Sequence, residues 1–190
     1  MLKSWNSIIT YCIFELFLAK AAQLQSGNLV KTFPSWGPNF KIIFDLKVTK
    51  TPNGDHNLLH FTTGKDNDGP GTRVPGVWLR PNKSNSFTQA LFNLISGNTT
   101  TMLVDINMSV KKEFVYSLVL NKSYNIELVQ EYGWFYIHVD GKRVWSHSTY
   151  TGTAIFKDVQ WWQSSNFSPS AGNVAELKNI QVLSTIEGSI

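Results

Sequence analysis

Cysteine and charged residues are both scarce in this chain of 190 residues. The one cysteine, Cys12, excludes a disulfide within the chain and a cysteine-rich zinc module. Charged residues make up 16% and hydrophobic residues 42% of the sequence, so the chain can bury a core and is not intrinsically disordered. The net charge of +4 is small and evenly spread, and its only dense basic spot is Lys111-Lys112. We therefore expect no nucleic-acid partner.

Residue groups that support catalysis are also missing. Glycoside hydrolysis requires two carboxylates no more than about 9.5 Å apart. Glu127 and Glu131 are four positions apart, which is about 13 Å along a strand. The same spacing separates His56 from His60, too far for both to bind one zinc ion. The sequence has no nucleophile motif and no phosphate-binding loop. We expect that the protein is not an enzyme.

Hydrophobic runs long enough to cross a bilayer, which takes about 20 residues, are absent as well. The apolar stretch over residues 8–19 follows the basic residue Lys3 and ends in the small-x-small pattern Ala19-Lys20-Ala21. This arrangement predicts a secretory signal peptide over residues 1–21, although Glu15 is unusual inside it. The alternatives are an amphipathic N-terminal helix or an uncleaved anchor. We expect a secreted, extracellular protein without stable membrane insertion, and cleavage after Ala21 would also remove the cysteine.

Acceptor sites for N-linked glycans fit an extracellular location. Five Asn-x-Ser/Thr triplets occur in the sequence, and occupied ones must lie at the surface. The candidate asparagines are Asn82, Asn98, Asn107, Asn121 and Asn166.

Short β-rich segments separated by turn residues fill the chain after residue 22, and helical periodicity is almost absent there. This pattern predicts an all-β fold, a two-sheet antiparallel sandwich. We expect a lead-in over residues 22–39 and one domain over residues 40–190. The expected strands are 40–48, 57–62, 73–80, 86–95, 101–108, 113–118, a meander within 124–148, 156–162 and 175–183.

Two turn dipeptides set the register of the meander. Asp140-Gly141 is a strong signal for a type I′ hairpin, because both central residues need a positive φ, and Tyr132-Gly133 can act in the same way. The first turn predicts that Ile137 pairs with Val144 and Tyr136 with Trp145. The second predicts that Leu128 pairs with Ile137 and Glu127 with His138.

The predicted register separates two faces of the meander. The core face carries Ile126, Leu128, Phe135, Ile137, Val139 and Val144. The opposite face is too polar for a core and too aromatic for an ordinary surface. It carries Glu127, Glu131, Trp134, Tyr136, His138, Arg143, Trp145 and His147.

The mixed face is the candidate ligand site. Its aromatic rings can stack on sugar rings while the flanking polar groups bind hydroxyls. The alternative is that the rings only pair across strands and stabilise the sheet. We expect Glu127 and Glu131 to form ion pairs with His138 or Arg143. Elsewhere, we expect Trp78 to pack inside, and Trp161 and Trp162 to point to opposite faces of one strand.

Several segments resemble a known family. Residues 44–50 (FDLKVTK), 59–64 (LHFTTG) and 73–78 (RVPGVW) resemble the first half of a concanavalin A-like jelly roll of the laminin G-like and pentraxin-like type. Residues 120–127 (LNKSYNIE), the Val139–Lys142 hairpin and residues 177–182 (LKNIQV) resemble its second half. The cysteine pair that is common before the arginine-proline motif is missing, and so is the sugar-binding strand of galectins, because Phe-Thr-Thr follows His60.

The resemblance implies a possible ion and a class of function. Members of this family often bind calcium near the rim of a sheet. Asp66 and Asp68 offer oxygen ligands for calcium on a loop. The alternative interpretation is that this loop is a solvated turn without an ion. We expect no cofactor other than calcium. The expected function is a non-catalytic binding module for carbohydrate or for cell and matrix adhesion, with a glycan or an extracellular protein as partner. The competing hypothesis is a structural matrix or protein–protein interaction domain without a sugar ligand.

Overall fold

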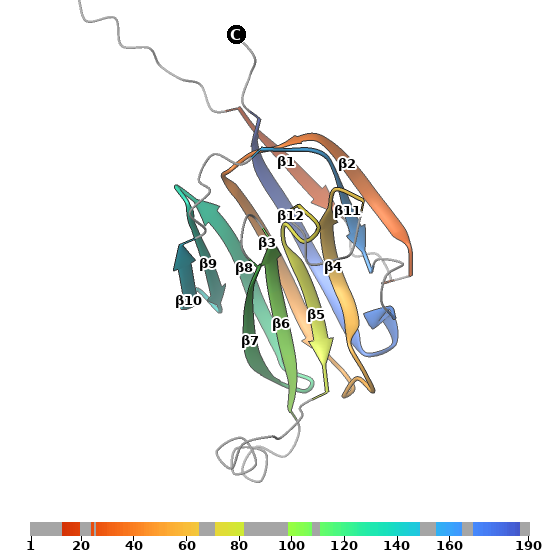
Figure 1. Ribbon diagram of the computed structural model, residues 1–190. Coiled ribbons are helices and arrows are strands. Elements are labelled where there is room, and N and C mark those ends of the chain that lie inside the picture. The colour runs from red at the N-terminus through yellow and green to blue at the C-terminus, as the bar shows by residue number, and fades with distance from the viewer. Residues whose placement is uncertain are drawn as a thin grey trace, which may run out of the picture.

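A computed structural model describes residues 13–19, 24, 26–64, 71–81, 99–107, 111–148, 155–164 and 169–186. Within these residues the chain forms two sheets of six strands that lie face to face (Figure 1). Sheet A contains, in spatial order, β1 (Ile13–Ala19), β12 (Ala175–Ile186), β3 (Phe40–Val48), β8 (Ser123–Glu131), β9 (Trp134–Val139) and β10 (Lys142–Ser148). Sheet B contains β2 (Asn28–Trp36), β11 (Phe156–Gln163), β4 (His56–Thr62), β5 (Gly76–Arg80), β6 (Thr99–Asn107) and β7 (Lys111–Val119). A 3₁₀ turn, η1 (Ala171–Asn173), precedes β12.

Alternation of apolar and polar residues explains how the strands are oriented. In β3, every second residue from Phe40 to Val48 is buried and the residues between them are partly exposed. Because successive side chains of a strand point to opposite faces, this pattern places one face of sheet A on the core and the other toward solvent. The predicted all-β, two-sheet sandwich is confirmed.

Aromatic rings fill the centre of the sandwich between the two sheets. The ring of Phe61 on β4 lies 5.0 Å from Trp36 on β2 and is stacked 5.6 Å from Trp161 on β11. All three side chains are fully buried. Burial of a large apolar side chain contributes about 1.5–3 kcal/mol, so this cluster is a major source of stability for a domain without a described disulfide.

All strand pairs within the two sheets are antiparallel, and some neighbouring strands, such as β3 and β8 or β2 and β11, come from distant parts of the chain. The meander β8–β9–β10 forms one side of sheet A, and β4–β5–β6–β7 forms most of sheet B. The segments β2, β3 and β4 alternate between the sheets, as do β10, β11 and β12. These crossings connect the two layers, and the outer face of sheet A carries partly exposed side chains whereas β4 and β5 of sheet B are buried on both faces.

The strand positions follow the sequence prediction closely, with two additions, β1 and β2. The strand expected over residues 40–48 has those bounds, and those expected near residues 57–62, 101–108, 113–118, 156–162 and 175–183 are all present. The strand expected over residues 86–95 lies outside the described residues. Residues 22–39, expected as a lead-in, contain β2, which pairs with β11 at an edge of sheet B.

The backbone near the N-terminus also takes part in a sheet. Strand β1 falls within the apolar stretch of the predicted signal peptide and pairs with residues 180–186 of β12. The signal peptide itself stays a prediction. Among the described residues, no helix has the length and the apolar character needed to traverse a membrane.

Candidate functional site

Both turns of the meander have the backbone conformation that the sequence predicts. Tyr132 and Gly133 have φ values of 48° and 78°, and Asp140 and Gly141 have values of 51° and 75°. Turns with two positive φ angles match the twist of the flanking strands and therefore fix the register of a hairpin. The pairs predicted between β8 and β9 are confirmed: Leu128 with Ile137 and Glu127 with His138.

The outer face of sheet A presents a row of polar groups beside a row of rings. Glu127 lies opposite His138, and His138 lies opposite Arg143, so one polar row crosses β8, β9 and β10. Trp134 and Tyr136 occupy alternate positions of β9 and face the same way as His138. Their ring centroids are 6.5 Å apart and their planes differ by 16°. Tyr136 and His138 are also 6.5 Å apart, which extends the platform along the strand.

A β-bulge changes the register of β10 after Arg143. The predicted pairing of Tyr136 with Trp145 is wrong, since Trp145 lies opposite Ile137 and His147 lies opposite Phe135. The bulge adds one residue to the strand, so every later side chain moves to the other face. Trp145 and His147 therefore leave the candidate surface and join the inner face of sheet A.

The relocated tryptophan closes one side of the sandwich. The Trp145 ring is 5.5 Å from Phe114 of β7 and 6.1 Å from Phe135 of β9. It thus connects the edge strand of sheet A with the edge strand of sheet B. Val144, which was predicted to face the core, also packs against it. Six residues of the predicted face remain, and the five other than Glu131 are referred to below as the aromatic-polar face: Glu127, Trp134, Tyr136, His138 and Arg143.

The acidic groups around this face have other partners than predicted. Glu127 forms an ion pair of 2.7 Å with Lys41 on β3, and no contact joins it to His138 or Arg143 in an ion pair. At the far end of the sheet, Lys178 donates a 2.9 Å hydrogen bond to Glu176. This hydrogen bond and the charge of Lys178 lower the pKa of the Glu176 carboxyl below its ordinary value.

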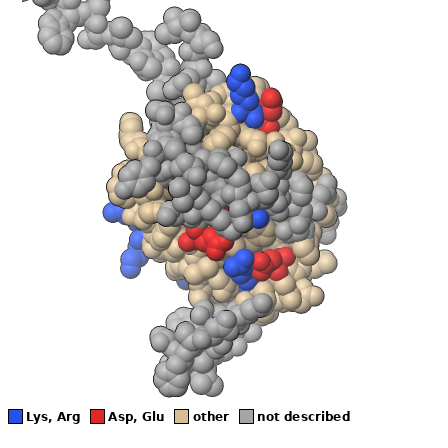
Figure 2. Space-filling model, in the orientation of Figure 1, with Lys and Arg blue, Asp and Glu red and all other residues tan. Residues whose placement is uncertain are grey.

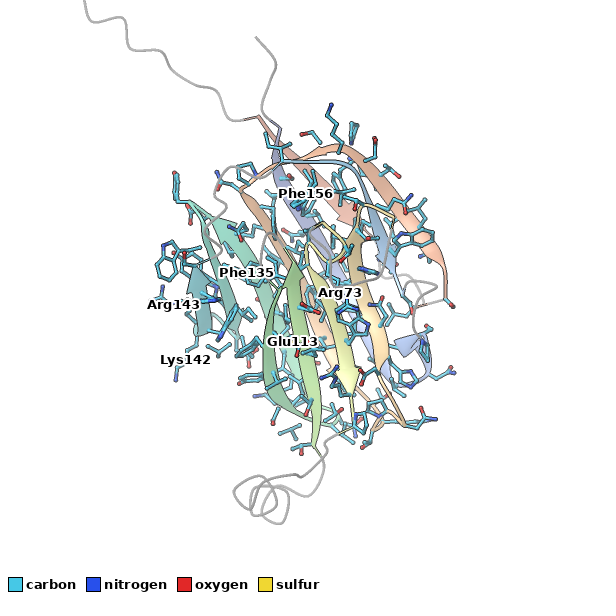
Figure 3. All side chains as sticks on the ribbon, viewed as in Figure 1. Arg73, Glu113, Phe135, Lys142, Arg143 and Phe156 are labelled. Carbon is cyan, nitrogen blue, oxygen red and sulfur yellow. The ribbon has the colours of Figure 1, made fainter. Side chains whose placement is uncertain are left out.

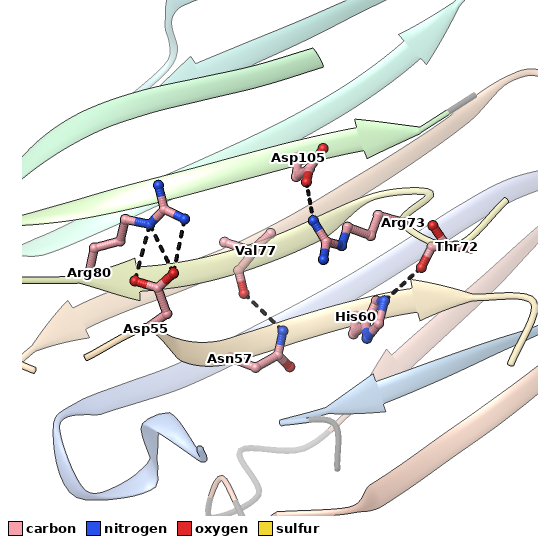
Figure 4. A network of polar contacts seen from close by, with 8 residues as sticks. All are labelled: Asp55, Asn57, His60, Thr72, Arg73, Val77, Arg80 and Asp105. Carbon is pink, nitrogen blue, oxygen red and sulfur yellow. Dashed lines mark hydrogen bonds and ion pairs between the residues drawn. The ribbon is translucent and has the colours of Figure 1, made fainter. Parts of the chain in front are cut away.

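A second polar cluster lies on the outer face of sheet B and was missed by the sequence analysis (Figure 4). The Arg73 guanidinium bonds to Asp105 of β6 at 2.6 Å and lies 5.0 Å over the ring of Trp78. The Trp78 side chain is buried, but it lies outside the main core cluster, on the side opposite Val77 and Leu79. Trp78 is therefore buried, as predicted, but on the face of sheet B that points away from the main core cluster.

These contacts hold the segment that precedes β5. His60 Nε2 is 2.7 Å from the Thr72 carbonyl oxygen, so this nitrogen carries the proton and donates the bond. Trp78 lies over Gly76, where a Cβ atom would come within 2.1 Å of the indole ring. The cluster joins a loop, β4 and β6, which are far apart in the sequence, so no local spacing reveals it. The position of Asp105 opposite Gly76 in the sheet brings the acid to the arginine.

Comparison with known structures shows which fold this arrangement belongs to. No protein-family model matches the sequence, and no curated protein sequence matches it. A SAP-like pentraxin from Limulus polyphemus aligns with 93% of this chain and 77% of its own at 11% identity and a TM-score of 0.51. A polysaccharide lyase of family 18 aligns over 95% and 92% at 12% identity and a TM-score of 0.51. The chain has the concanavalin A-like jelly-roll fold.

The jelly roll is shared by binding proteins and enzymes, and at these identities it establishes the fold alone. The binding domain of botulinum neurotoxin serotype D aligns with 84% of this chain at 10% identity and a TM-score of 0.50. This chain spans 34% of the length of that toxin chain. The neighbours thus include binding domains as well as a lyase.

The remaining predicted sites can be located on the jelly roll only in part. Asp66 and Asp68, the candidate calcium ligands, lie outside the described residues, as do Asn82, Asn98 and Asn166. The described residues contain no group of three metal-binding side chains. Asn107 ends β6. Asn121 is exposed in the turn between β7 and β8, with a φ of 62°.

Proposed function

We propose that this protein is a secreted, non-catalytic binding module that holds a glycan on the aromatic-polar face of sheet A. The nearly parallel rings of exposed Trp134 and partly exposed Tyr136 carry the proposal. Rings that lie side by side on a flat strand offer a stacking surface to the apolar side of a sugar, and the adjacent polar row offers partners for its hydroxyls.

Exposure distinguishes this face from the polar cluster on sheet B. Trp134 is 46% exposed, whereas Trp78, His60 and Asp105 are all less than a tenth exposed. A ligand can reach the first group without any rearrangement of the protein. Large exposed aromatic residues are unusual for a surface that has no ligand.

The alternative is a structural or matrix domain whose aromatic-polar face contacts another protein. Exposed aromatic residues are equally suited to a protein interface. The two functions differ in their ligand, so glycan binding decides between them. Calcium at the loop containing Asp66 and Asp68 stays part of this proposal.

The first prediction is that Trp134→Ala weakens glycan binding at least about fivefold, since loss of a central aromatic contact typically costs more than about 1 kcal/mol. Glycan arrays followed by calorimetric titration would measure the change. Trp162→Ala is the matched control, because Trp162 is a partly buried tryptophan that pairs with His60 in the other sheet. It should leave the dissociation constant unchanged.

Two results would contradict the proposal. Absence of binding to any glycan would favour the protein-interaction alternative. Binding that survives Trp134→Ala but is lost in Trp162→Ala would place the site on sheet B instead.

A further inference from the structure

Most acidic side chains on the outer face of sheet A have a partner within the chain. Lys41 neutralises Glu127, and Lys178 neutralises Glu176. Asp45 accepts hydrogen bonds of 2.9 Å and 2.6 Å from two asparagine amides. The electrostatic character of the face therefore depends on the charged groups that remain without a counter-ion.

Arg143 is such a group. Its guanidinium lies 5.5 Å from the centre of the Tyr136 ring. In the described part of the chain, no carboxylate forms an ion pair with it. Contact with the face of a ring orients the guanidinium but leaves its positive charge in place. Its N–H groups can still bind a carboxylate or a sulfate through two parallel hydrogen bonds.

The surroundings of Arg143 reinforce this positive charge. Lys142, the next residue along the hairpin, likewise forms no ion pair with a described residue. Figure 3 shows both side chains at β10, on the outer flank of the molecule. Figure 2 shows basic surface on the same flank. Lys142 precedes Arg143 in the same strand and points to the opposite face, so it adds positive charge to this edge of the sheet while Arg143 alone faces the candidate surface.

We propose that the ligand of the aromatic-polar face is an acidic saccharide. Its carboxylate or sulfate group binds Arg143 beside His138, and its sugar ring stacks on Trp134 farther along β9. This inference rests on the proposed function, because it specifies the class of glycan that the same face takes. It goes beyond that function in requiring a negative charge on the ligand.

A cationic ligand is the competing possibility, and Glu131 is the residue that would favour it. Glu131 is exposed, lies opposite Trp134 and has no partner among the described residues. It lies at the end of β9 remote from His138, about 13 Å along the strand. Glu131→Gln therefore separates the two cases, since it weakens the binding of a cation and does not weaken the binding of an anion.

The test compares charged and neutral forms of the same glycans by calorimetric titration. The probes are a sulfated galactan oligosaccharide with its desulfated form, and an oligouronate with its carboxyl-reduced form. The second pair distinguishes a carboxylate from a sulfate as the preferred group. We expect the charged form of at least one pair to bind more tightly, with a preference that falls as the salt concentration rises.

Variants then assign this preference to Arg143. Arg143→Ala should weaken binding of the charged form roughly two- to tenfold, as expected for loss of an exposed charge contact, and should weaken binding of the neutral form less, so that the preference for the charged form disappears. Arg143→Lys should restore only part of the effect, because an ammonium cannot make the paired hydrogen bonds. Lys157→Ala, which removes an exposed charge from β11 in sheet B, is the matched control and should preserve the preference.

The outcomes separate this inference from the proposed function. Equal binding of charged and neutral forms, or a preference that persists in Arg143→Ala, overturns the inference and leaves the glycan-binding function intact. Weaker binding in Glu131→Gln points to a cationic ligand and also overturns it. If neither form of any probe binds the unmodified protein, both proposals are wrong.

Discussion

Asp105 carries its charge at a position with no solvent exposure, on a face of sheet B that lies outside the main core. Transfer of a carboxylate out of water is strongly unfavourable unless a cation and hydrogen bonds replace the lost hydration. Arg73 supplies that cation at 2.6 Å, and its own side chain is 18% exposed. The pair therefore connects the loop before β5 with β6, and loss of either partner leaves a poorly solvated charge.

We expect Asp105→Asn to lower the free energy of unfolding by about 2–4 kcal/mol, somewhat less than for a fully buried pair because Arg73 retains contact with water. Urea denaturation would measure the loss. A double-mutant cycle with Arg73→Gln provides the control, and the double variant should lose less than the sum of the single losses. Additive losses would show that the two side chains are not energetically coupled.

At the scale of secondary-structure elements, the bulge in β10 decides which tryptophan is exposed and which packs between the sheets. Trp134 lies before the turn on a regular strand and stays outside, whereas Trp145 lies after the bulge and turns inward. Bulges are common at sheet edges, where no second neighbour enforces the register. In β10 the bulge turns the Trp145 ring inward, where it packs between the edge strands β10 and β7 of the two sheets.

The two tryptophans should consequently differ in their effect on stability. Trp145→Ala should lower the free energy of unfolding by about 2–3 kcal/mol, since it removes a partly buried ring packed on Phe114 and Phe135. Trp134→Ala should change it by no more than about 0.5 kcal/mol. Chemical denaturation monitored by circular dichroism would compare the variants. Equal losses would contradict the placement of the two rings on opposite faces.

The sequence reveals the strands and most of the register but not the bulge, for a physical reason. The alternation in β3 and the two positive-φ turns of the meander are local signals, and each produced a correct prediction. Val144 and Trp145 are both apolar, so either can point inward and the hydrophobic pattern does not show where a residue is inserted. The edge strand β2 was missed because Pro34 and its polar residues obscure the alternation.

The candidate site was predictable to a similar extent. Five of its residues come from three strands joined by short turns, so their common face follows from pairing alone. The partner of Glu127 could not be predicted in this way, because Lys41 is distant in the sequence. Lys41 comes close to Glu127 only through the pairing of β3 with β8. The cluster of Arg73, His60 and Asp105 could not be predicted for the same reason.

For the whole molecule, the N-terminal segment determines which strand forms one edge of sheet A. With β1 in place, residues 180–186 of β12 are covered by a neighbouring strand. Cleavage after Ala21 would remove β1 and make β12 the edge of a five-stranded sheet. The core residues of the other strands do not depend on that removal, since β12 still pairs with β3.

Expression in a secreting eukaryotic host tests this prediction together with glycosylation. The secreted product should begin at Ala22 by N-terminal sequencing and should lose one glycan mass in Ser123→Ala. This variant destroys the acceptor triplet of Asn121 but keeps Asn121 itself. Asn121 has a φ of 62°, a conformation that asparagine tolerates better than most other residues do. Retention of Met1 in the product would contradict cleavage of the signal peptide. An unchanged glycan mass in Ser123→Ala would contradict glycosylation of Asn121.

The contact between Gly76 and Trp78 has a consequence for how this sequence can evolve. Because the indole ring occupies the space of a side chain at position 76, the tryptophan and the glycine must be retained or replaced together. A change at either position alone meets a clash or leaves a void beside Arg73 and Asp105. In homologues of this chain, positions 76 and 78 should therefore change together. Such covariation of two positions on one strand is not captured by substitution tables that treat each position separately.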